Sequence, residues 1–284
     1  MGLGDLGLAA VASLQSIDRW IATINSNMAG SGRVGYKASE VKFGGGTVSS
    51  DRPIVAPRLG INIAEQSLGV AQTTVDYSQG AVVASTDFAH LALQRTSASP
   101  GLFLLNSESD GSGDAYYTFD GEFHINANGF LVNNDGLFLM ARNTPPTNTL
   151  RAAALGPTAG DIVNDQISLE RVAIITIPNP QLQLEFSRYG ATTFQEVGAG
   201  NANPGAAGSN FTFANNLANV DSVGNYSSGS GVSGRVIPNA LEASNSSLTA
   251  ETPKLALAQK MYAAIAKVIS VALQNVDVVL NLSR

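Results

Sequence analysis

Residues 5–28, DLGLAAVASLQSIDRWIATINSNM, place apolar side chains at a helical spacing. Intervals of 4, 3, 4, 3 and 4 residues separate the members of this seam, which are Ala10, Leu14, Ile17, Ile21, Ile24 and Met28. Asp5 is a plausible N-cap. Gly30, Gly32 and Gly35 then interrupt the pattern, and Gly ends helices because it adopts the left-handed conformation at little cost. The sequence predicts a helix that ends near residue 29.

The other end of the chain mirrors this pattern. One heptad seam consists of Ala258, Tyr262, Ile265, Ile269, Ala272, Val276 and Val279. A second seam runs beside it and consists of Leu257, Met261, Ala264, Val268, Val271 and, after the polar Asn275, Val278. Thr252-Pro253 is a reasonable cap and first-turn pair, and a start a few residues earlier is also compatible with the sequence. Two seams require two neighbours.

The apolar surface of these ends is too large for isolated helices. Fixing each backbone residue costs about 1–2 kcal/mol, which only packing offsets, and burying each Val, Ile or Leu returns about 1.5–3 kcal/mol. The two helices can cover one seam each, whereas the second C-terminal seam has no partner in them. We therefore expect pairing within the subunit as well as packing between subunits. The predicted subunit-interface residues are Leu14, Ile17, Trp20, Ile21, Ile24, Met28, Leu257, Met261, Tyr262, Ile265, Val268, Ile269, Val276 and Val279.

Trp20 lies beside the first seam, next to Ile21. A large aromatic side chain at this position either anchors a neighbouring helix or completes the local core. The sequence alone favours neither role.

The middle of the chain changes to period-two patterns and turn residues. Asp120-Gly121, Asn128-Gly129 and Asp135-Gly136 are typical of tight hairpin turns, because these pairs supply positive φ angles. They predict an antiparallel meander with strands at 116–119, 122–125, 130–132 and 137–140. Further strands are expected at 172–177 and 182–186, separated by prolines.

The predicted fold class is α+β: long N- and C-terminal helices paired as a coiled-coil-like layer, with a central, mainly antiparallel β domain. Residues 143–161 and 197–235 are expected to form long loops or linkers. The expected domains are an N-terminal helix at 1–35, an extended connecting segment at 36–74, a β-rich domain at 75–225, and a linker with the C-terminal helix at 226–284.

Composition excludes several classes of protein. Charged residues make up 13% of the 284 residues, the net charge is -6, and no cluster of Lys or Arg occurs, so neither nucleic acid nor an anionic membrane is an expected partner. The absence of cysteine excludes disulfides and thiolate chemistry. The N-terminus does not have the pattern of a secretory signal peptide, and the longest uninterrupted apolar runs are too short to span a bilayer, so no membrane insertion is expected.

No pattern in the chain indicates chemistry. The two histidines, His90 and His124, stand in no metal-ligand spacing with carboxylates. Residues 110–114, DGSGD, lack the ligand alternation of an EF-hand, and the glycines at 44–46 are not followed by the Lys-Ser/Thr of a phosphate loop. No Gly-x-Ser-x-Gly elbow supports a serine nucleophile. We expect no catalytic residue, no metal and no cofactor.

Several motifs, in their order along the chain, resemble the bacterial flagellar rod and hook protein family. The first helix is followed by an Asn-rich turn and Gly-Tyr-Lys, here Asn25–Ala29 and Gly35–Ala38, although the residues GSGRV at 30–34 replace the usual Asn, Val and Thr. The most specific match covers Tyr117–Phe123, Asn128–Val132 and Asp135-Gly136. Other matches are Gln79-Gly80, Thr86–Phe88, Gly101–Leu104, Ile177–Pro180 with Leu184, Gly190 and Phe194, Leu241–Asn245, Gln259–Tyr262 and Ala266–Ile269, with Ile265 where Asn is usual.

This resemblance implies a structural subunit of the flagellar basal-body rod or hook, acting in motility. It implies export through the flagellar type III apparatus without a cleaved signal peptide, and a periplasmic to extracellular location. It also implies self-assembly into a helical tube with the termini inside and the β domain outside, which transmits torque and encloses the export channel. The implied partners are further copies of the chain, other flagellar axial proteins and the export apparatus.

Two other classes of function stay open. One is a secreted β-rich adhesin or binding module whose helical ends form a stalk. The other is a hydrolase with a site that no motif marks. A monomer at high concentration with a ligand for residues 75–225 would distinguish the adhesin, and an activity lost on changing one polar residue would distinguish the hydrolase.

Overall fold

Two compact units make up the chain. The computed structural model describes residues 3–45, 48–51, 62–65, 67–95, 100–142, 150–155, 161–163, 166–167, 172–177, 179–198, 202–204, 209, 211, 225–227 and 232–282. We name the two parts the helix–hairpin unit, formed by Met1–Ala29, Ser39–Asp76 and Ser247–Arg284, and the β unit, formed by Gly30–Ala38 and Tyr77–Ser246. The chain passes between the two units four times.

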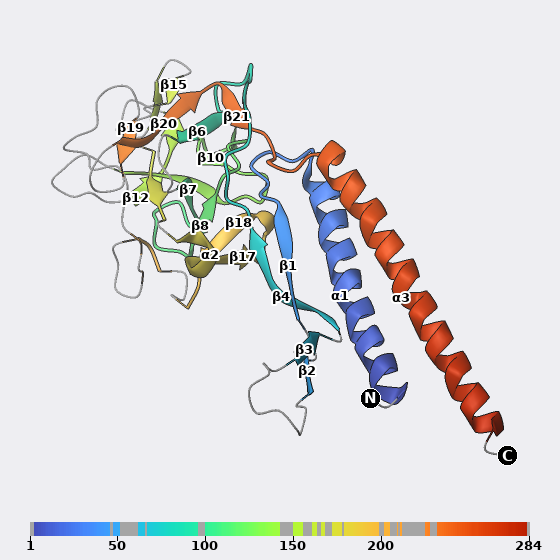
Figure 1. Cartoon of the computed structure of the whole chain (residues 1–284). Helices are drawn as coiled ribbons and strands as arrows, with labels where there is room; N and C mark the ends of the chain where they lie inside the picture. Colours follow the sequence, from blue (N-terminus) through green and yellow to red (C-terminus); the bar gives the residue numbers. More distant parts are fainter. Residues whose placement is uncertain are drawn as a thin grey trace. The chain divides into compact units, whose positions relative to one another are not determined.

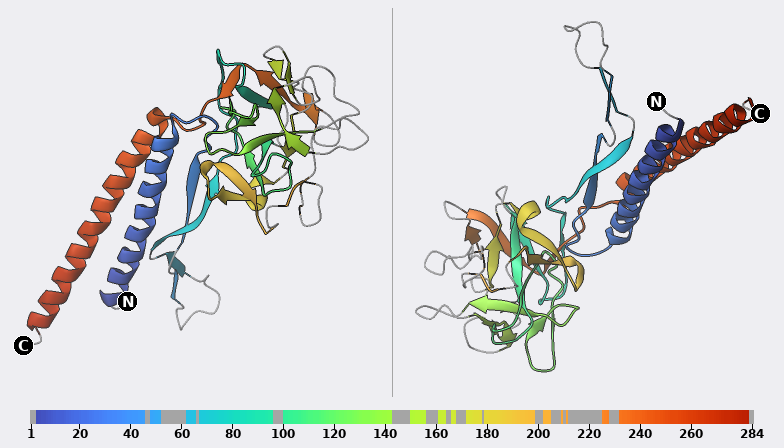
Figure 2. Two further views of the ribbon diagram at one scale, coloured as in Figure 1. Left: turned by 180° about the vertical axis from the view of Figure 1, so that it is seen from behind. Right: turned by 90° about the horizontal axis from the view of Figure 1, so that it is seen from below.

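The helix–hairpin unit contains two long helices, which lie side by side and run in opposite directions (Figures 1 and 2). Helix α1 spans Leu3–Gly30 and helix α3 spans Leu248–Leu282. Strands β1 (Ser39–Gly45) and β4 (Leu68–Val75) form an antiparallel pair with a bulge between Lys42 and Phe43. Strands β2 (Val48–Asp51) and β3 (Asn62–Glu65) form a second antiparallel pair. Both terminal helices are therefore present as the sequence predicts, and their coiled-coil packing stays a prediction.

A small apolar core joins the two helices. Ile17 and Ile24 of α1 are buried against Ala258 of α3. Partly buried apolar side chains surround this group, and they are Trp20, Ile21, Met28, Leu68, Leu255, Met261 and Ile265. Members of one seam on each helix thus face each other, as expected when two amphipathic helices bury their apolar faces.

Polar side chains of α1 fasten the β1–β4 pair to the helix. The Asn27 side-chain amide donates to the Ser39 carbonyl (2.8 Å) and accepts from the Ser39 N–H (2.9 Å). Farther along α1, Ser16 Oγ donates to the Leu68 carbonyl (2.9 Å), and Ser13 Oγ accepts from the Leu68 N–H (2.9 Å). These bonds satisfy backbone groups at the ends of both strands, which would be costly to bury unpaired.

The Trp20 ring packs edge-to-face on Phe43 of β1, with 5.3 Å between the ring centroids. This contact lies within the chain, so Trp20 completes local packing between α1 and the strand pair. Its predicted contribution to a contact between subunits stays a prediction.

The ends of the two helices agree with the sequence predictions to within a few residues. A Cβ atom at Gly30, the last residue of α1, would collide with the Tyr36 ring, so this position needs Gly for close packing, while Gly35 has the positive φ of 66°. Helix α3 begins at Leu248 and not at Pro253, because Ser247 Oγ caps it by accepting from the Ala250 N–H (3.2 Å). Pro253 therefore lies inside the helix.

The β unit is built around a nine-stranded, mainly antiparallel sheet, whose path is β17-β18-β8-β7-β11-β10-β9, with β12 beside β11 and β16 beside β7. These strands are β7 (Gly101–Asn106), β8 (Ala115–Thr118), β9 (His124–Ile125), β10 (Leu131–Val132), β11 (Phe138–Arg142), β12 (Leu150–Ala152), β16 (Ile174–Thr176), β17 (Leu184–Ser187) and β18 (Gly190–Glu196). A one-turn helix, α2 (Pro180–Gln183), precedes β17.

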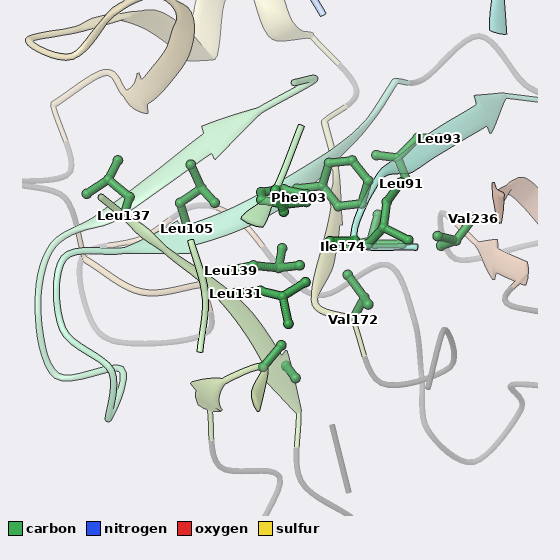
Figure 3. Close-up of a cluster of buried hydrophobic side chains, with 14 of the residues drawn as sticks. Leu91, Leu93, Phe103, Leu105, Leu131, Leu137, Leu139, Val172, Ile174 and Val236 are labelled. Atoms are coloured by element: carbon green, nitrogen blue, oxygen red, sulfur yellow. The ribbon is translucent and has the colours of Figure 1, made fainter. Parts of the chain in front are cut away.

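Smaller sheets complete the unit. They pair β19 (Asn225–Ser227) and β6 (Leu91–Arg95) with β20 (Val232–Pro238), β21 (Ala240–Glu242) with β5 (Val82–Ala84), and β14 (Asp161–Val163) with β13 (Ala154–Leu155) and β15 (Gln166–Ile167). The β13–β14 pair is parallel. The core of the unit lies between these strands (Figure 3), and its labelled side chains are Leu91, Leu93, Phe103, Leu105, Leu131, Leu137, Leu139, Val172, Ile174 and Val236.

Two copies of one turn organise the strands β9, β10 and β11. Asn126 Oδ1 accepts from the N–H groups of Asn128 and Phe130, and Gly129 has a positive φ of 83°. Residues 133–137 repeat this arrangement, with Asn133 in place of Asn126 and with a φ of 81° at Gly136. The sequence predicted both turns, and the glycines adopt the left-handed conformation that L side chains disfavour.

Other details of the predicted meander are wrong. Gly121 is not among the positive-φ glycines, and it is required because a Cβ there would collide with the Leu91 carbonyl of β6. Strand β8 pairs with β7 and β18 and not with β9, so the connection crosses the sheet. Residues 180–183 are helical where a strand was expected from 182, and strands β12, β13 and β20 form inside the expected loops. Within those loops, 143–149, 156–160 and most of 199–224 lie outside the described residues.

We predict that Asn27→Ala loosens the β1–β4 pair. The change removes both side-chain bonds to Ser39, each worth about 1 kcal/mol, and leaves its backbone groups without these partners. Amide hydrogen exchange in residues 39–45 and 68–75 should become about tenfold faster or more. The exposed neighbour Asn25 provides the control, and equal exchange in Asn25→Ala and Asn27→Ala would contradict this role.

Candidate functional site

Helix α3 exposes an unusual amount of apolar surface. Most of the large apolar side chains that are exposed among the described residues lie on this helix, and they are Leu248, Leu257, Tyr262, Val268, Val271, Leu273, Val278, Val279 and Leu282. Scattered exposed apolar residues are normal, but a continuous apolar surface on one helix marks a contact surface. We therefore treat α3 as the candidate functional site.

The predicted interface residues separate into two groups. Ile17 and Ile24 are buried in the core between the helices, and Trp20, Ile21, Met28, Met261 and Ile265 pack against it. Leu14, Ile269 and Val276 are half-buried, while Leu257 (53% exposed), Tyr262 (38%), Val268 (47%) and Val279 (53%) face outward. The structure thus brings the first group together inside the chain. Contact between subunits stays a prediction for all of them.

The outward residues on α3 include a stripe that is separate from its buried face. We define the outer stripe as Leu257, Ala264, Val268, Val271 and Val278, all exposed, with Lys260 and Lys267 along it. At about 100° per residue, this stripe lies roughly 100° around the helix from the buried Ala258 and Ala272. One helical partner cannot cover both faces.

The apolar character of α3 also bears on membranes. Residues Leu248–Val279 are long and apolar enough, by length and composition, to cross a bilayer. The expectation of no membrane insertion rested on uninterrupted apolar runs, which this helix does not contain because Lys260, Lys267 and Asp277 interrupt it. The absence of membrane insertion therefore stays a prediction.

A second candidate site, which is polar, lies within the β unit. The side chains of Lys37 and Glu242 are 1% and 3% exposed, and Lys37 Nζ donates to Glu242 Oε1 at 2.6 Å. Lys37 also donates to the Ser78 carbonyl (2.9 Å) and lies 4.3 Å from the centroid of the Phe119 ring. Glu242 Oε1 accepts a further bond from the Gly80 N–H (2.8 Å). This buried ion pair joins three segments that are distant in sequence.

Further bonds make these three segments a single cluster, which we name the junction cluster: 35–38, 78–80 and 242–245. The Asn245 side chain accepts from the Ala38 N–H (2.7 Å) and donates to the Ser78 carbonyl (3.2 Å). The Gly35 N–H donates to the Glu242 carbonyl (2.7 Å), and a Cβ at Gly80 would collide with the Ala243 carbonyl. Each segment lies beside one of the four points at which the chain passes between the units, so the cluster holds three of these four points together.

The geometry of the junction cluster indicates a structural role. The cavity beside Lys37 and Glu242 measures about 10 Å³, which has room for no more than one water molecule. Within the described part of the chain, no group of three or more His, Cys, Asp or Glu side chains could hold a metal. A buried, fully enclosed ion pair of this kind positions chain segments and offers no space for a substrate.

A serine–histidine contact among the described residues is also part of a turn. Ser85 Oγ lies 2.7 Å from His90 Nδ1, and the same hydroxyl accepts from the Asp87 N–H (3.2 Å). Asp87 Oδ1 in turn accepts from the Ala89 N–H (2.9 Å), while its other oxygen lies 3.9 Å from His90 Nε2. These bonds are those of a local side-chain turn, and neither Ser85, Asp87 nor His90 lines the cavity beside Lys37 and Glu242.

Sequence reasoning missed the polar part of the site. Asn27, Lys37, Glu242 and Asn245 all lie in motifs that carried the family resemblance, but their spacing in the sequence gives no sign that they meet. Only the pairing of β21 with β5 brings Glu242 opposite Val82 and close to Gly80. The signal in the sequence was that short motifs with polar residues recur near the points where the chain enters or leaves the β unit. Their recurrence there could have indicated that their side chains meet.

Comparison with known proteins supports the flagellar resemblance. Residues 101–194 match the model of the flagellar hook protein FlgE/F/G D1 domain. This match covers most of the nine-stranded sheet, from β7 to β18. None of the curated proteins compared with the chain matches it. The resemblance to the flagellar rod and hook family is thereby confirmed, and the family is structural and not enzymatic.

We predict that Lys37→Met destabilises the β unit by about 3–5 kcal/mol, because Glu242 then keeps a buried charge without its cation. The double variant with Glu242→Gln should be more stable than the single variant, since no buried charge remains. Urea unfolding followed by the tyrosine near-ultraviolet circular dichroism measures both. The exposed Lys42→Met serves as the control, and a double variant no more stable than the single one would contradict this account.

We also predict a pH dependence from Asp120. Burial raises the pKa of its carboxyl from 3.8 to about 6, against the opposing effect of the Glu122 N–H. The folded state therefore holds this proton after the unfolded state has lost it, so stability falls as pH rises from about 4 to about 6, by at most about 3 kcal/mol. Asp120→Asn should remove this fall and Glu185→Gln, at an exposed site, should not. Parallel stability–pH curves for wild type and Asp120→Asn would show that Asp120 does not cause this pH dependence.

Proposed function

We propose, from the match of residues 101–194 to the flagellar hook protein FlgE/F/G D1 domain, that this chain is a structural subunit that self-assembles into a helical tube. In this proposal the terminal helices form the inner layer and enclose the export channel, the β unit lies outside, and the tube transmits torque. Other axial proteins of the flagellum are its neighbours at the ends of the tube. The chain reaches its site through the flagellar export apparatus without a cleaved signal peptide.

The exposed outer stripe of α3 is the observation that carries this proposal. The helix uses one face for α1, and its second apolar face stays in water in a single chain. Covering each Val or Leu of that face gains about 1.5–3 kcal/mol at full burial, and neighbouring copies supply cover along the whole length of the helix. A periodic assembly provides that cover to every copy equally, as the repeated heterologous contact of an open helical polymer does.

Rigid segments within each subunit support a mechanical role. Torque passes through an assembly only if its parts do not bend. Buried ion pairs, and glycines at which two backbone segments pack closely, resist local rearrangement. The junction cluster holds together three of the four points at which the chain passes between the units, and the Asn27 and Leu68 bonds hold the β1–β4 pair on α1. Both features lie at positions where a flexible linker would absorb strain.

A secreted β-rich adhesin with a helical stalk is the competing proposal. It also accommodates a folded β unit and an amphipathic helix pair. It differs in predicting a chain that stays monomeric at high concentration and binds a glycan or host protein through residues 75–225. The polymerisation experiment below therefore separates the two.

Deleting residues 262–284 should abolish polymerisation and leave the β unit folded. The deletion removes most of the outer stripe and all of the seam that faces α1 except Ala258, while the β unit loses none of its residues. Negative-stain images and sedimentation measure assembly, and the tyrosine near-ultraviolet signal measures the fold of the β unit. Gln259→Ala with Gln274→Ala, two exposed polar positions on α3, is the control. Filaments formed by the truncated chain would refute the proposal.

A further inference from the structure

The helix–hairpin unit contains a groove that its own side chains do not fill. It measures about 380 Å³ and is bordered by α1, the β1–β4 pair and the first turns of α3. Its apolar walls are formed by Trp20, Ile24, Val41, Phe43, Leu68 and Met261. Its polar rim consists of Thr23, Asn27, Ser39, Glu40, Glu251 and Lys254. Such a groove, apolar inside and polar at the rim, is suited to an amphipathic helix.

One carboxylate on the rim is only half satisfied. Glu251 is 3% exposed, and its Oε1 accepts from Lys254 Nζ at 2.7 Å. Its Oε2 is buried and has no hydrogen-bond partner among the described residues. A buried carboxylate oxygen without a donor is unfavourable, and nearly all such atoms in proteins find one. Because Glu251 lines the groove, an occupant that carries a cation would supply the missing donor.

The charges of the rim specify this occupant further. Glu40 and Glu251 place two carboxylates around the groove, against the single cation of Lys254. The outer stripe of α3 combines the apolar Leu257, Val268 and Val271 with the cations Lys260 and Lys267. The small Ala264 lies between the two lysines and permits close approach of the helix backbone. An acidic, apolar groove and a basic, apolar ridge thus occur on the same chain.

We infer that the outer stripe of α3 from one copy docks in the groove of a second copy, with Lys260 or Lys267 donating to Glu251. This inference rests on the proposed function and names the contact that would build the tube. The stripe cannot fill the groove of its own chain, because α3 already forms one wall of that groove with an adjacent side, through Glu251, Lys254 and Met261. The contact is therefore heterologous, and repetition of a heterologous contact generates an open helical polymer.

Cysteine cross-linking between two chains tests this contact directly, because the protein contains no cysteine of its own. Thr23→Cys places a thiol on the groove wall, and Ala264→Cys places one on the stripe. The two full-length variants, carrying different tags, are mixed, assembled and oxidised. We expect a disulfide-linked heterodimer. Lys42→Cys is the matched control, since Lys42 is an exposed neighbour of groove residues Val41 and Phe43 on the same strand.

Charge removal provides a second readout in otherwise native chains. Lys260→Gln with Lys267→Gln should raise the concentration needed for assembly roughly fivefold, the effect of losing about one ion pair. Glu185→Gln, on the exposed edge of the β unit, should leave that concentration unchanged. An unchanged assembly concentration in the double lysine variant would overturn the assignment of the lysines.

The possible outcomes separate this inference from the proposed function. A heterodimer from Thr23→Cys and Ala264→Cys, absent with Lys42→Cys, supports the contact. Tubes that form without this cross-link overturn the contact and leave the structural role intact, and the groove then takes another occupant. Chains that form no assembly at any concentration overturn both.

Discussion

Helix α3 has more apolar surface than its own chain can cover, and this constraint organises the helix–hairpin unit. Its buried face meets Ile17 and Ile24 of α1, and its outer stripe lies roughly 100° around the helix from that face. Helix α1 contacts α3 through Ile17 and Ile24, and it contacts the strand pair through Trp20, which packs on Phe43. Helix α3 has one face covered inside the chain, the face that meets α1. Among the described residues, neither the outer stripe of α3 nor the groove beside Trp20 is covered, and the two are complementary in charge and polarity.

The β unit is stabilised by different means. Its core is a cluster of aliphatic and aromatic side chains from strands β6 to β20, and tight turns set the register of β9, β10 and β11. The buried Lys37–Glu242 pair contributes little by itself, since its attraction is offset by the loss of hydration. Its importance is geometric, because it fixes three chain exits at one place. In the proposed torque-transmitting role, a defined geometry at these points matters more than additional stability.

The sequence predicted the parts of the fold that depend on local patterns. The heptad spacing located both helices, and the Asn-Gly and Asp-Gly pairs located two turns, because in each case the responsible residues are neighbours along the chain. The position of β8 between β7 and β18 could not be predicted, since strand order depends on contacts between distant segments. Gly121 was assigned to a turn for its usual conformation, whereas it is required by the approach of Leu91. The partners of Asn27 and Lys37 are likewise set by tertiary structure alone.

The central claim is that copies of the chain stack to cover the outer stripe of α3. Hydrogen exchange of α3 at increasing protein concentration, with electron micrographs of the same samples, tests it most directly. The account predicts fast exchange in residues 257–278 for the dilute chain, and slow exchange together with helical tubes above a threshold concentration. An α3 that is already protected in a monodisperse monomer, and that stays monomeric at high concentration, would contradict the account.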